Sequence, residues 1–443
     1  MNVLEDDLAK VYRHYFWAAF GSALATSIYS VVDVVAVGRY HGPIGLAAMA
    51  VIAPVWNIIL SLALLSGIGG SILYAVQRGK RAAVLPANRF FAASLIVAAV
   101  FSVLIMVALF CFEEPVLRFF GADDNLLPLA ARYLQPVRCS VPLFLLGTTI
   151  MAFLRNDGNP RLAMCAILAG GVFNVFGDCY FVFTRDMGIF GAGLATVLGE
   201  AIAVGVMLTH FLLRRNTLRI ELPRAPALFA RQVVVVGFPA FFTDVSMGLL
   251  TIVFNRQIMR YLGEDALAVY GVVVTIGTFV QCCGYGVGQA AQPLLSANFG
   301  AGNTDRIRQT VRYSVATALL LALLWCAAVG LVPNAFMRAF TRPTPALLAL
   351  APGILRVYSL AFWFLPLNIL STYCFQSLCR PRAAFAVSLA RGFLVPVALL
   401  CTLPALWGGA ALWAAIPLAE FLVAAAIGLS LLRPSRPAGA KCK

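Results

Sequence analysis

The chain has 443 residues, of which 61% are hydrophobic and only 12% are charged, and its mean hydropathy is +0.90. This composition excludes an ordinary soluble domain and indicates a polytopic membrane protein. The net charge of +15 would suggest a nucleic-acid ligand in a soluble protein. In a membrane protein it reflects unequal charge on the two sides, so we predict no nucleic-acid partner.

Apolar runs of roughly 20 residues or more, each long enough to cross the hydrocarbon as a helix, recur along the whole chain. The first run carries Asp33 and is too long for a signal-peptide core, so we predict that it is retained. The runs do not alternate polar and apolar residues, which disfavours a β-barrel. We predict twelve spans, at residues 14–37, 47–77, 88–112, 132–155, 161–184, 190–213, 231–256, 266–296, 311–333, 350–379, 383–406 and 409–432.

Lysine and arginine residues gather at every second connection between these spans. Examples are Arg78 with Lys80, Arg155 with Arg161, and the basic connection 214–231. By the positive-inside rule these connections face the cytoplasm, which places both termini there and requires an even number of spans. We therefore predict a multi-pass protein of the cell inner (plasma) membrane.

Internal repeats indicate that the chain has two related halves. "RYHGPIGLAAMAV" at Arg39 pairs with "RYLGEDALAVYGV" at Arg260, and "NPRLAM" at Asn159 pairs with "RPRAAF" at Arg380 across the same interval. "GAGLAT" at Gly191 and "GAALWA" at Gly409 follow across nearly that interval. We predict an N-terminal six-helix lobe (1–213), a cytoplasmic linker (214–231) and a C-terminal six-helix lobe with a short basic cytoplasmic tail (232–443). Two parallel lobes facing one another would leave a central cleft.

Acidic residues at membrane depth are the main functional signal. Each costs roughly 2.5 to 3.5 kcal/mol near a helix centre, so each requires a buried partner or marks an ion pathway. The five are Asp33, Asp178, Glu200, Asp244 and Glu420. Arg391 of the eleventh predicted span is placed to form a buried ion pair with Glu420, for which we predict a structural role. The role of Glu200 stays open.

One group of these polar residues is expected to meet in the outer half of the N-terminal bundle. Asn174 and Asp178 are four residues apart on one helix face, and Thr196 follows the small residues at 191–193, which permit close helix approach. Asp33 is at a similar depth in the first span. Such oxygen ligands suit a small hard cation, and paired carboxylates equally suit a proton. The alternative is that Asn174 only joins two helices by a hydrogen bond.

Several motifs together resemble those of the multidrug and toxic compound extrusion (MATE) family of secondary antiporters. They are "VDVVAVGRYHG" closing the first span, "FLRNDGNP" ending the fourth, "NVFGD" in the fifth and "GIFGAGLAT" opening the sixth. The resemblance covers nearly the whole chain and implies an all-α polytopic fold with twelve transmembrane helices in two pseudo-symmetric six-helix lobes. It also implies cation-driven export of amphipathic, often cationic compounds by alternating access.

The same resemblance assigns a cation site to Asp33, Asn174, Asp178 and Thr196. Thr148 stands where the family often has an asparagine, which leaves the coupling ion open between a proton and sodium; sodium would bind at the four residues just named. No other cofactor is expected. Some family members use an acid in the seventh span, so Asp244 is interpreted as a second cation or substrate-charge site, or else as a structural hydrogen-bonding residue.

The substrate cleft is expected to be lined by aromatic, amide and methionine side chains from both lobes. Rings bind lipophilic cations by dispersion and cation–π attraction, and methionine adapts to varied shapes. Besides Asp244, the candidates are Trp56, Asn57, Phe241, Phe242, Met247, Gln281, Gln289, Trp363, Phe364 and Tyr373.

Two other function classes fit the sequence less well. A flippase for lipid-linked saccharides would share the two-lobe architecture but needs a more cationic cavity than the few internal arginines provide. A membrane enzyme such as a prenyltransferase would need Asp-rich Mg-binding motifs, and the pair Asp123 and Asp124 lies in an outside loop without further acids. We therefore predict a transporter, not an enzyme, that acts as a monomer on small molecules in the lipid bilayer.

Overall fold

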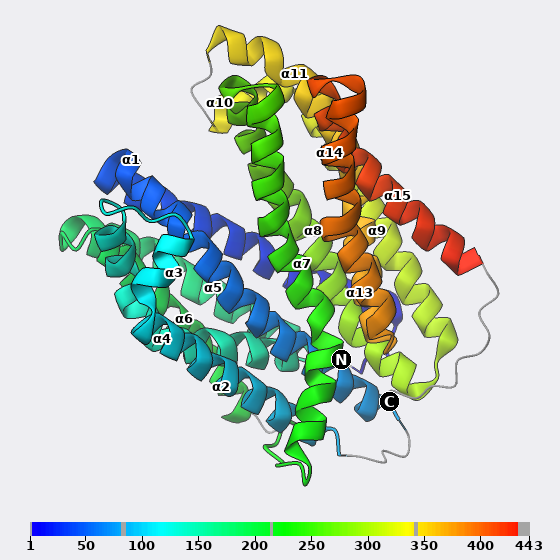
Figure 1. Ribbon diagram of the computed structural model, residues 1–443. Helices are drawn as coiled ribbons and strands as arrows, with labels where there is room; N and C mark the ends of the chain where they lie inside the picture. The colour runs from blue at the N-terminus through cyan, green and yellow to red at the C-terminus, as the bar shows by residue number, and fades with distance from the viewer. Residues whose placement is uncertain (1, 81–85, 213–215, 341–343, 433–443) are drawn as a thin grey trace. The chain divides into compact units, whose positions relative to one another are not determined.

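The computed structural model describes residues 2–80, 86–212, 216–340 and 344–432, and within these ranges the regular elements are all helical (Figure 1). The α-helices are α1 (Leu8–Gly79), α2 (Asn88–Cys111), α3 (Glu113–Phe119), α4 (Leu127–Asn156), α5 (Pro160–Gly177), α6 (Ile189–Leu212), α7 (Pro226–Tyr261), α8 (Glu264–Ala301), α9 (Thr304–Leu331), α10 (Pro333–Phe340), α11 (Pro345–Ser359), α12 (Leu365–Ser377), α13 (Pro381–Leu389), α14 (Val395–Trp407) and α15 (Ala415–Leu432). Four short segments continue or precede them: the π-helices η1 (Asp178–Thr184) and η3 (Ala390–Leu394), and the 3₁₀ helices η2 (Leu360–Trp363) and η4 (Gly409–Ala414).

Eleven helical segments of the described chain are long and apolar enough to cross a membrane. The first of them, α1, has 72 residues and is broken at Gly42, whose φ of 65° and ψ of −149° are not helical. A residue with a Cβ adopts this conformation only under strain, and Pro43 follows directly, so two spans meet at this glycine. Counting α1 as two spans confirms the twelve-helix prediction.

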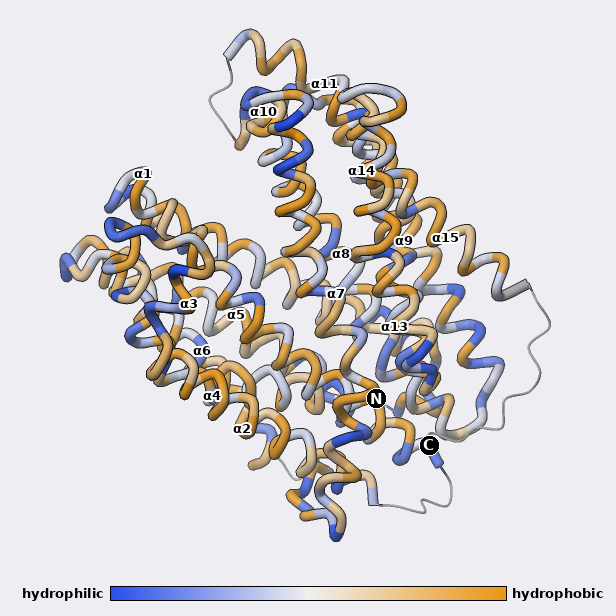
Figure 2. The backbone as a smooth tube through the Cα atoms, in the orientation of Figure 1, coloured by the Kyte–Doolittle hydropathy of each residue, from blue (hydrophilic) through white to orange (hydrophobic). Residues whose placement is uncertain are grey.

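The helices carry apolar side chains on the faces that no other helix covers. Figure 2 shows hydrophobic colour along most of α2 and α4. On α2, Val100, Val103, Leu104 and Val107 recur at helical spacing and are all exposed. A soluble protein would bury such a stripe, whereas lipid tails solvate it, so these exposed faces agree with membrane insertion.

The described chain forms two compact units. The first contains the residues up to Phe241 together with Ser296–Thr304, and the second contains Phe242–Leu295 and the described residues from Asp305 on. The first unit gathers α1, α2, α4, α5 and α6 around a core that includes Ile52, Ile59, Val137 and Leu145 (Figure 1). The second unit contains most of α7 and α8 and nearly all of α9 to α15.

The start of α7 belongs to the first unit because it packs closely on α1. A Cβ on Gly69 would lie 2.2 Å from the Val233 carbonyl oxygen, and one on Gly237 would lie 2.0 Å from the Leu65 carbonyl oxygen. The division into 1–213, 214–231 and 232–443 follows the sequence repeat and stays a prediction. Residues 213–215 of the predicted lobe boundary and linker, and 433–443 of the predicted tail, lie outside the described residues.

Pseudo-symmetry is also visible in two short helices that the hydropathy pattern did not predict. The α3 helix begins at Glu113, directly after the third span, and α10 begins at Pro333, directly after the ninth. The interval between these two starts is close to the interval between Arg39 and Arg260 of the sequence repeat. The two halves therefore share even the short connections between spans.

Candidate functional site

Close packing of α5 and α6 sets the geometry of the predicted cation site. A Cβ on Gly170 would lie 2.5 Å from the Gly199 carbonyl oxygen, and one on Gly177 would lie 2.9 Å from the Ala195 Cβ. On the other side of α6, a Cβ on Gly193 would lie 2.5 Å from the Tyr133 carbonyl oxygen of α4. Small residues thus bring three helices within backbone contact, as the sequence pattern predicts.

Asp178 stands at the point where α5 changes its helical winding. The α-helix ends at Gly177, and the π-helix η1 begins with Asp178 itself. A π-segment widens the helical turn and shifts the side chains that follow it, and such segments are frequent at functional sites. The Asp178 side chain is completely buried in the first unit.

The structure brings the four predicted side chains together and adds a fifth. Asn174 donates from Nδ2 to the Thr196 hydroxyl oxygen at 3.2 Å, and the Asp33 and Asp178 carboxyl groups are in side-chain contact with each other. Tyr133 donates its hydroxyl to Asp33 Oδ2 at 3.0 Å. We call Asp33, Tyr133, Asn174, Asp178 and Thr196 the carboxylate cluster.

Open acceptor atoms distinguish the carboxylate cluster from an ordinary structural network. Asp33 Oδ1, Asn174 Oδ1 and both carboxylate oxygens of Asp178 are buried without a hydrogen-bond donor among the described residues. Buried polar atoms are normally satisfied, and two carboxylates in contact can each only accept. A proton or a small cation would satisfy these oxygens, so the residues present fit either ion.

Tyr133 was missed in the sequence because a tyrosine in a predicted span is usually a packing or interface residue. Its ring lies in the core of the first unit, and the signal was the need of a buried hydroxyl for a partner. Thr148, by contrast, is not part of the carboxylate cluster. It lies about four turns beyond Tyr133 on α4, roughly 22 Å along the helix axis, and its hydroxyl makes no hydrogen bond to the cluster in the described chain.

Glu200 also lies apart from the cluster, one turn beyond Thr196 on α6. Its carboxylate is next to α4, where a Cβ on Gly147 would lie 2.6 Å from Glu200 Oε1. Gly147 directly precedes Thr148, so Glu200 and Thr148 occupy the same level of the bundle. The glycine makes room for the carboxylate between the two helices.

The second unit holds a separate polar network around Arg391, in the π-helix η3. Arg391 Nε donates to Glu420 Oε1 at 2.8 Å and to Oε2 at 3.2 Å, and both side chains are 7% exposed. Asn368 Nδ2 donates to Glu420 Oε2 at 2.6 Å and to the Glu420 carbonyl oxygen at 2.9 Å. The predicted buried pair is confirmed. Nearby on α7, Asp244 accepts a hydrogen bond from the Tyr285 hydroxyl at 3.0 Å.

A cavity of about 110 Å³ adjoins this network within the second unit. Met247 and Gln281, two of the predicted substrate residues, line it together with Arg391 and Glu420. Its other walls are mainly apolar and aromatic, including Tyr270 and Tyr358.

The other predicted substrate residues do not line this cavity. Trp56 packs edge-on against Phe144, with ring centroids 4.8 Å apart, in the core of the first unit, and Phe242 packs against Phe385 in the same manner. Tyr373 is buried so closely against Gly288 that a Cβ there would lie 2.4 Å from its ring. These three rings therefore have packing contacts within their own units, and their part in substrate binding stays a prediction. Phe241 packs against Phe238, with ring centroids 5.8 Å apart, and Phe364 packs edge-on against Phe421 at 5.4 Å. Asn57, Gln289 and Trp363 also lie outside the cavity lining.

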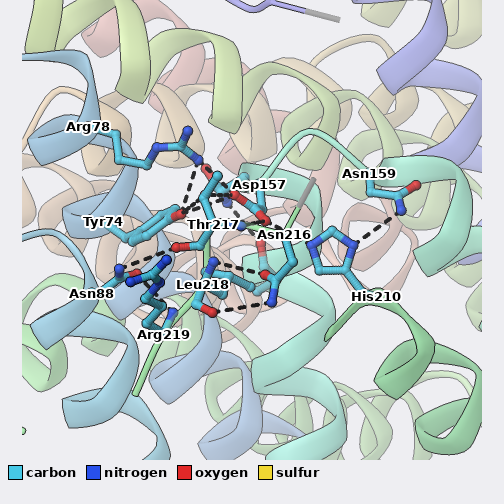
Figure 3. Close-up of polar contacts among 12 residues, drawn as sticks. Tyr74, Arg78, Asn88, Asp157, Asn159, His210, Asn216, Thr217, Leu218 and Arg219 are labelled. Carbon is cyan, nitrogen blue, oxygen red and sulfur yellow. Dashed lines mark hydrogen bonds and ion pairs between the residues drawn. The ribbon is translucent and has the colours of Figure 1, made fainter. Parts of the chain in front are cut away.

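A third network lies at the end of α4 and was not assigned by the sequence analysis, although "FLRNDGNP" contains its centre. Asp157 binds Arg78 Nη1 at 2.7 Å, lies 2.8 Å from His210 Nε2, and accepts hydrogen bonds from the Tyr74 hydroxyl at 3.2 Å and the Thr217 backbone N–H at 3.1 Å (Figure 3). The Thr217 hydroxyl is bonded to it as well. One carboxylate thus ties α1 and α6 to the segment that precedes α7.

The protonation of Asp157 reflects these contacts. Burial raises its pKa, but hydrogen bonds from His210 and Thr217 and the charge of Arg78 outweigh burial and hold the pKa below its usual range. A carboxylate whose pKa is lowered by folding stabilises the folded state above its unfolded pKa. That stabilisation is lost only as the pH falls through the lowered value, so it is fully present at neutral pH.

We expect Asp157→Asn to lower the free energy of unfolding at neutral pH by roughly 1.5 to 3 kcal/mol, the range for hydrogen bonds to a charged group. Denaturation of the purified protein in mixed micelles measures the loss. The difference from wild type should shrink as the pH falls from about 4, the ordinary pKa of an aspartate in the unfolded chain, through the lowered pKa of Asp157 in the folded protein. A constant difference across that pH range would contradict an electrostatic role for Asp157.

The comparisons with known proteins decide the family. The MatE family model matches residues 18–179 and again residues 239–400, more than half of the chain. The chain belongs to the MATE family. The two matches begin at residues 18 and 239, the same interval that separates Arg39 from Arg260 in the internal repeat of this MATE transporter.

Similar proteins cover nearly its full length. The multidrug export protein MepA of Staphylococcus haemolyticus (strain JCSC1435) is 22% identical over 406 residues, covering 91% of this chain and 89% of MepA. MepA of Staphylococcus aureus (strain MRSA252) is 23% identical over 421 residues, covering 94% of this chain and 92% of MepA.

Solved structures agree with the fold. The MATE multidrug transporter DinF-BH, solved in a complex, is 28% identical, with a TM-score of 0.87 and coverage of 96% of this chain and 95% of DinF-BH. A multidrug resistance MATE family transporter of the MOP superfamily, in an outward-facing conformation, has a TM-score of 0.89 at 20% identity and covers 98% of both chains. The MATE fold with two six-helix lobes therefore holds for this chain.

Proposed function

We propose that this MATE transporter is a multidrug exporter of the plasma membrane, which expels amphipathic or cationic compounds by alternating access in exchange for protons or sodium ions. Family membership supports transport, and the multidrug activity named for MepA and for DinF-BH supports drug-like substrates. The ion-driven step rests on the carboxylate cluster.

The single observation that carries the proposal is the buried contact between Asp33 and Asp178 with its open acceptor oxygens. Two adjacent negative charges at membrane depth are unfavourable without a compensating charge. Uptake and release of one cation would therefore change the local charge balance strongly. If that uptake favours one transporter conformation over the other, an ion gradient can drive the conformational cycle, because a ligand shifts an equilibrium by its differential affinity.

The choice between proton and sodium depends on how many oxygens can reach the ion. The cluster offers carboxylate, amide and hydroxyl oxygens on α1, α4, α6 and the α5–η1 helix, but Thr148 does not contribute a ligand. Fewer neutral oxygen ligands weaken a sodium site more than a proton site, because a proton needs only one or two acceptors. We therefore propose the proton as the main coupling ion.

Transport of ethidium in proteoliposomes, under separately imposed proton and sodium gradients, tests the proposal. We expect export against a proton gradient and a smaller response to sodium alone. If a sodium gradient alone drove transport at the same rate, sodium and not the proton would be the main coupling ion. Transport that ignored both gradients would remove the antiporter mechanism altogether.

For Asp244 we expect a substrate-dependent effect. If this half-buried carboxylate, held by Tyr285, helps to neutralise cationic substrate, Asp244→Asn should lower the export of cationic compounds by roughly 5- to 150-fold, the usual range for a coupling between sites. Export of neutral compounds should change much less. Tyr285→Phe serves as the matched control, because it removes the hydrogen bond and keeps the charge. An equal loss for both substrate kinds would indicate a structural role.

The proposed orientation, with both termini in the cytoplasm, gives a separate prediction. If α7 starts at the cytoplasm, α7 and α8 each cross the membrane once, and the turn before α9 returns to the cytoplasmic side. That turn contains Gly302 and Asn303. A cysteine introduced at Asn303 should react with a membrane-impermeant maleimide only in inside-out vesicles. Labelling from outside intact cells would reverse the orientation.

The flippase alternative lacks support. It requires free cationic groups in a substrate cavity, whereas the arginine that lines the cavity of the second unit, Arg391, is neutralised by Glu420. MepA and DinF-BH, moreover, are named as multidrug transporters.

A further inference from the structure

A basic pocket lies in the first unit, apart from the carboxylate cluster. Its cavity volume is about 450 Å³, and it is formed by the first turns of α1 and the start of α5. Its lining includes Lys10, Arg13, His14 and Trp17 of α1, and Arg161 and Met164 of α5. We call this set the basic pocket.

The spacing of these residues directs them to one place. Positions 10, 13, 14, 17 and 18 follow the i, i+3, i+4, i+7, i+8 pattern of one helix face, and positions 161 and 164 on α5 are three residues apart, which also places them on one face. The two helices approach closely just beyond the pocket, where a Cβ on Gly21 would lie 2.9 Å from Met164 Sδ. The two helices therefore meet at the end of the pocket that lies away from the helix starts.

The cations of the basic pocket have no acidic partner among the described residues. Among the residues that the structure describes, no ion pair includes Lys10, Arg13 or Arg161. The nearest acids in sequence are engaged elsewhere. Glu5 and Asp6 accept hydrogen bonds from Asn2, and Asp7 caps α1 by accepting from the Ala9 N–H. Three positive charges around one cavity call for an anion.

The order of polarity along α1 indicates what kind of anion fits. The charged residues come first, and Trp17 and Ala18 follow one to two turns later, about 10 Å further along the axis. Trp17 is 63% exposed and makes edge-on contacts with Phe16 and Phe20, at centroid distances of 5.3 and 6.2 Å. Exposed tryptophan near a helix end is typical of the membrane interface. The pocket thus offers a charged end and an apolar end in the order of a phospholipid headgroup and its acyl chains.

We propose that the basic pocket binds the phosphate headgroup of an anionic phospholipid, with Trp17 and Met164 against the upper acyl chain. Basic pockets between membrane helices on the cytoplasmic side bind such headgroups. The site is separate from the proposed export path, because three uncompensated cations repel a cationic substrate. It would make the transporter sensitive to the anionic lipid content of its membrane.

Quenching of tryptophan fluorescence by brominated lipid tests this proposal. The purified wild-type protein is reconstituted in phosphatidylcholine vesicles that contain either brominated phosphatidylglycerol or brominated phosphatidylcholine at the same mole fraction. We expect stronger quenching by the brominated phosphatidylglycerol, and we expect that excess to vanish in Trp17→Phe, which leaves the other tryptophans in place. Equal quenching of the wild-type protein by the two lipids would overturn the proposal.

Variants of the two pocket arginines test whether the preference for phosphatidylglycerol depends on their charge. Arg13→Gln and Arg161→Gln should each lower the relative association constant for phosphatidylglycerol by roughly fivefold, as expected for one basic residue near an anionic headgroup. Arg308→Gln is the matched control, since Arg308 is an exposed arginine of the second unit, and it should leave the constant unchanged. An excess of quenching that survives in the Arg13→Gln/Arg161→Gln double variant would refute the site.

Inorganic phosphate distinguishes a lipid from a soluble anion. Added to vesicles at the molar amount of the brominated phosphatidylglycerol, it should leave the quenching unchanged, because it lacks the acyl chains that Trp17 and Met164 contact. Loss of the excess quenching on adding phosphate would show that the pocket takes a free anion and would overturn the lipid proposal. Circular dichroism and gel filtration of each variant establish that it is folded, and the wild-type comparison does not depend on the variants.

Discussion

Purified Asp178→Asn protein in proteoliposomes should lose gradient-driven export of ethidium, by a factor on the order of a hundred. Asparagine has nearly the shape of aspartate but cannot release a proton, so the variant mimics a permanently neutral side chain. Its amide can also donate to Asp33, which would satisfy one of the open oxygens of the cluster. The gradient would then have no charge change to act on, and the conformational equilibrium would no longer respond to it.

Folding and insertion of this variant should be intact, because removing a buried charge at membrane depth eases insertion. Substrate binding at equilibrium should survive, with a flatter dependence on pH. Asp124→Asn is the matched control: the Asp124 side chain is 87% exposed and binds Arg118 at the surface, so the export rate of this variant should equal that of wild type. Wild-type export by the Asp178→Asn variant would make Asp178 a structural residue and remove the basis of the proposed coupling.

The twelve spans could be predicted from the sequence because each needs only a long apolar run, and that signal is local. The predicted run 14–37 and the run 47–77 even flank the break at Gly42, although the structure joins them in one helix, α1. Asp33, Asn174, Asp178 and Thr196 were brought together by a similar argument. Helical spacing and depth place them at one level, and small residues allow the helices to approach.

Other parts of the site required three-dimensional packing. The resemblance to the family placed Thr148 where other members often have an asparagine. In the structure Tyr133 is the α4 residue that contacts the cluster, and Thr148 lies roughly four turns away on the same helix. The aromatic candidates stay predictions for a different reason. Trp56 and Tyr373 are of a residue type that suits a binding surface. Whether each ring faces a cavity or a neighbouring helix depends on tertiary contacts, such as those with Phe144 and Gly288. Sequence spacing contains no information about these contacts.

Asp157 shows a further limit of reading charge from sequence. It lies between two predicted spans, where a charged side chain has little free-energy cost and therefore gives no sign of a special role. In the structure its side chain is fully buried and is shared by Arg78 and His210, and it also holds Thr217 of the segment between the sixth and seventh spans. Each of these partners lies more than fifty positions from Asp157 in the sequence, so only the fold reveals the network.

The largest expected effect on stability concerns the buried pair in the second unit. Glu420→Gln should destabilise the protein by about 3 to 5 kcal/mol, because the Arg391 guanidinium would remain buried without its counter-charge. The loss would be measured by denaturation in mixed micelles. Asp305→Asn is the control, since Asp305 and Arg308 are 3.9 Å apart and their side chains are 88% and 83% exposed; this change should have no measurable effect.

Replacing both Arg391 and Glu420 distinguishes two contributions to the free energy of unfolding: the penalty for one unpaired buried charge, and the net stabilisation by the ion pair. The double variant Arg391→Met/Glu420→Met removes both charges and fills the space with flexible apolar side chains. Asn368 keeps an acceptor, because its Nδ2 also donates to the backbone carbonyl of residue 420 at 2.9 Å. We therefore expect the double variant to recover most of the stability that Glu420→Gln loses, as buried pairs often contribute little beyond mutual compensation. If the double variant were as unstable as the single one, the ion pair between Arg391 and Glu420 would make a net contribution to the stability of the second unit, beyond compensating two buried charges.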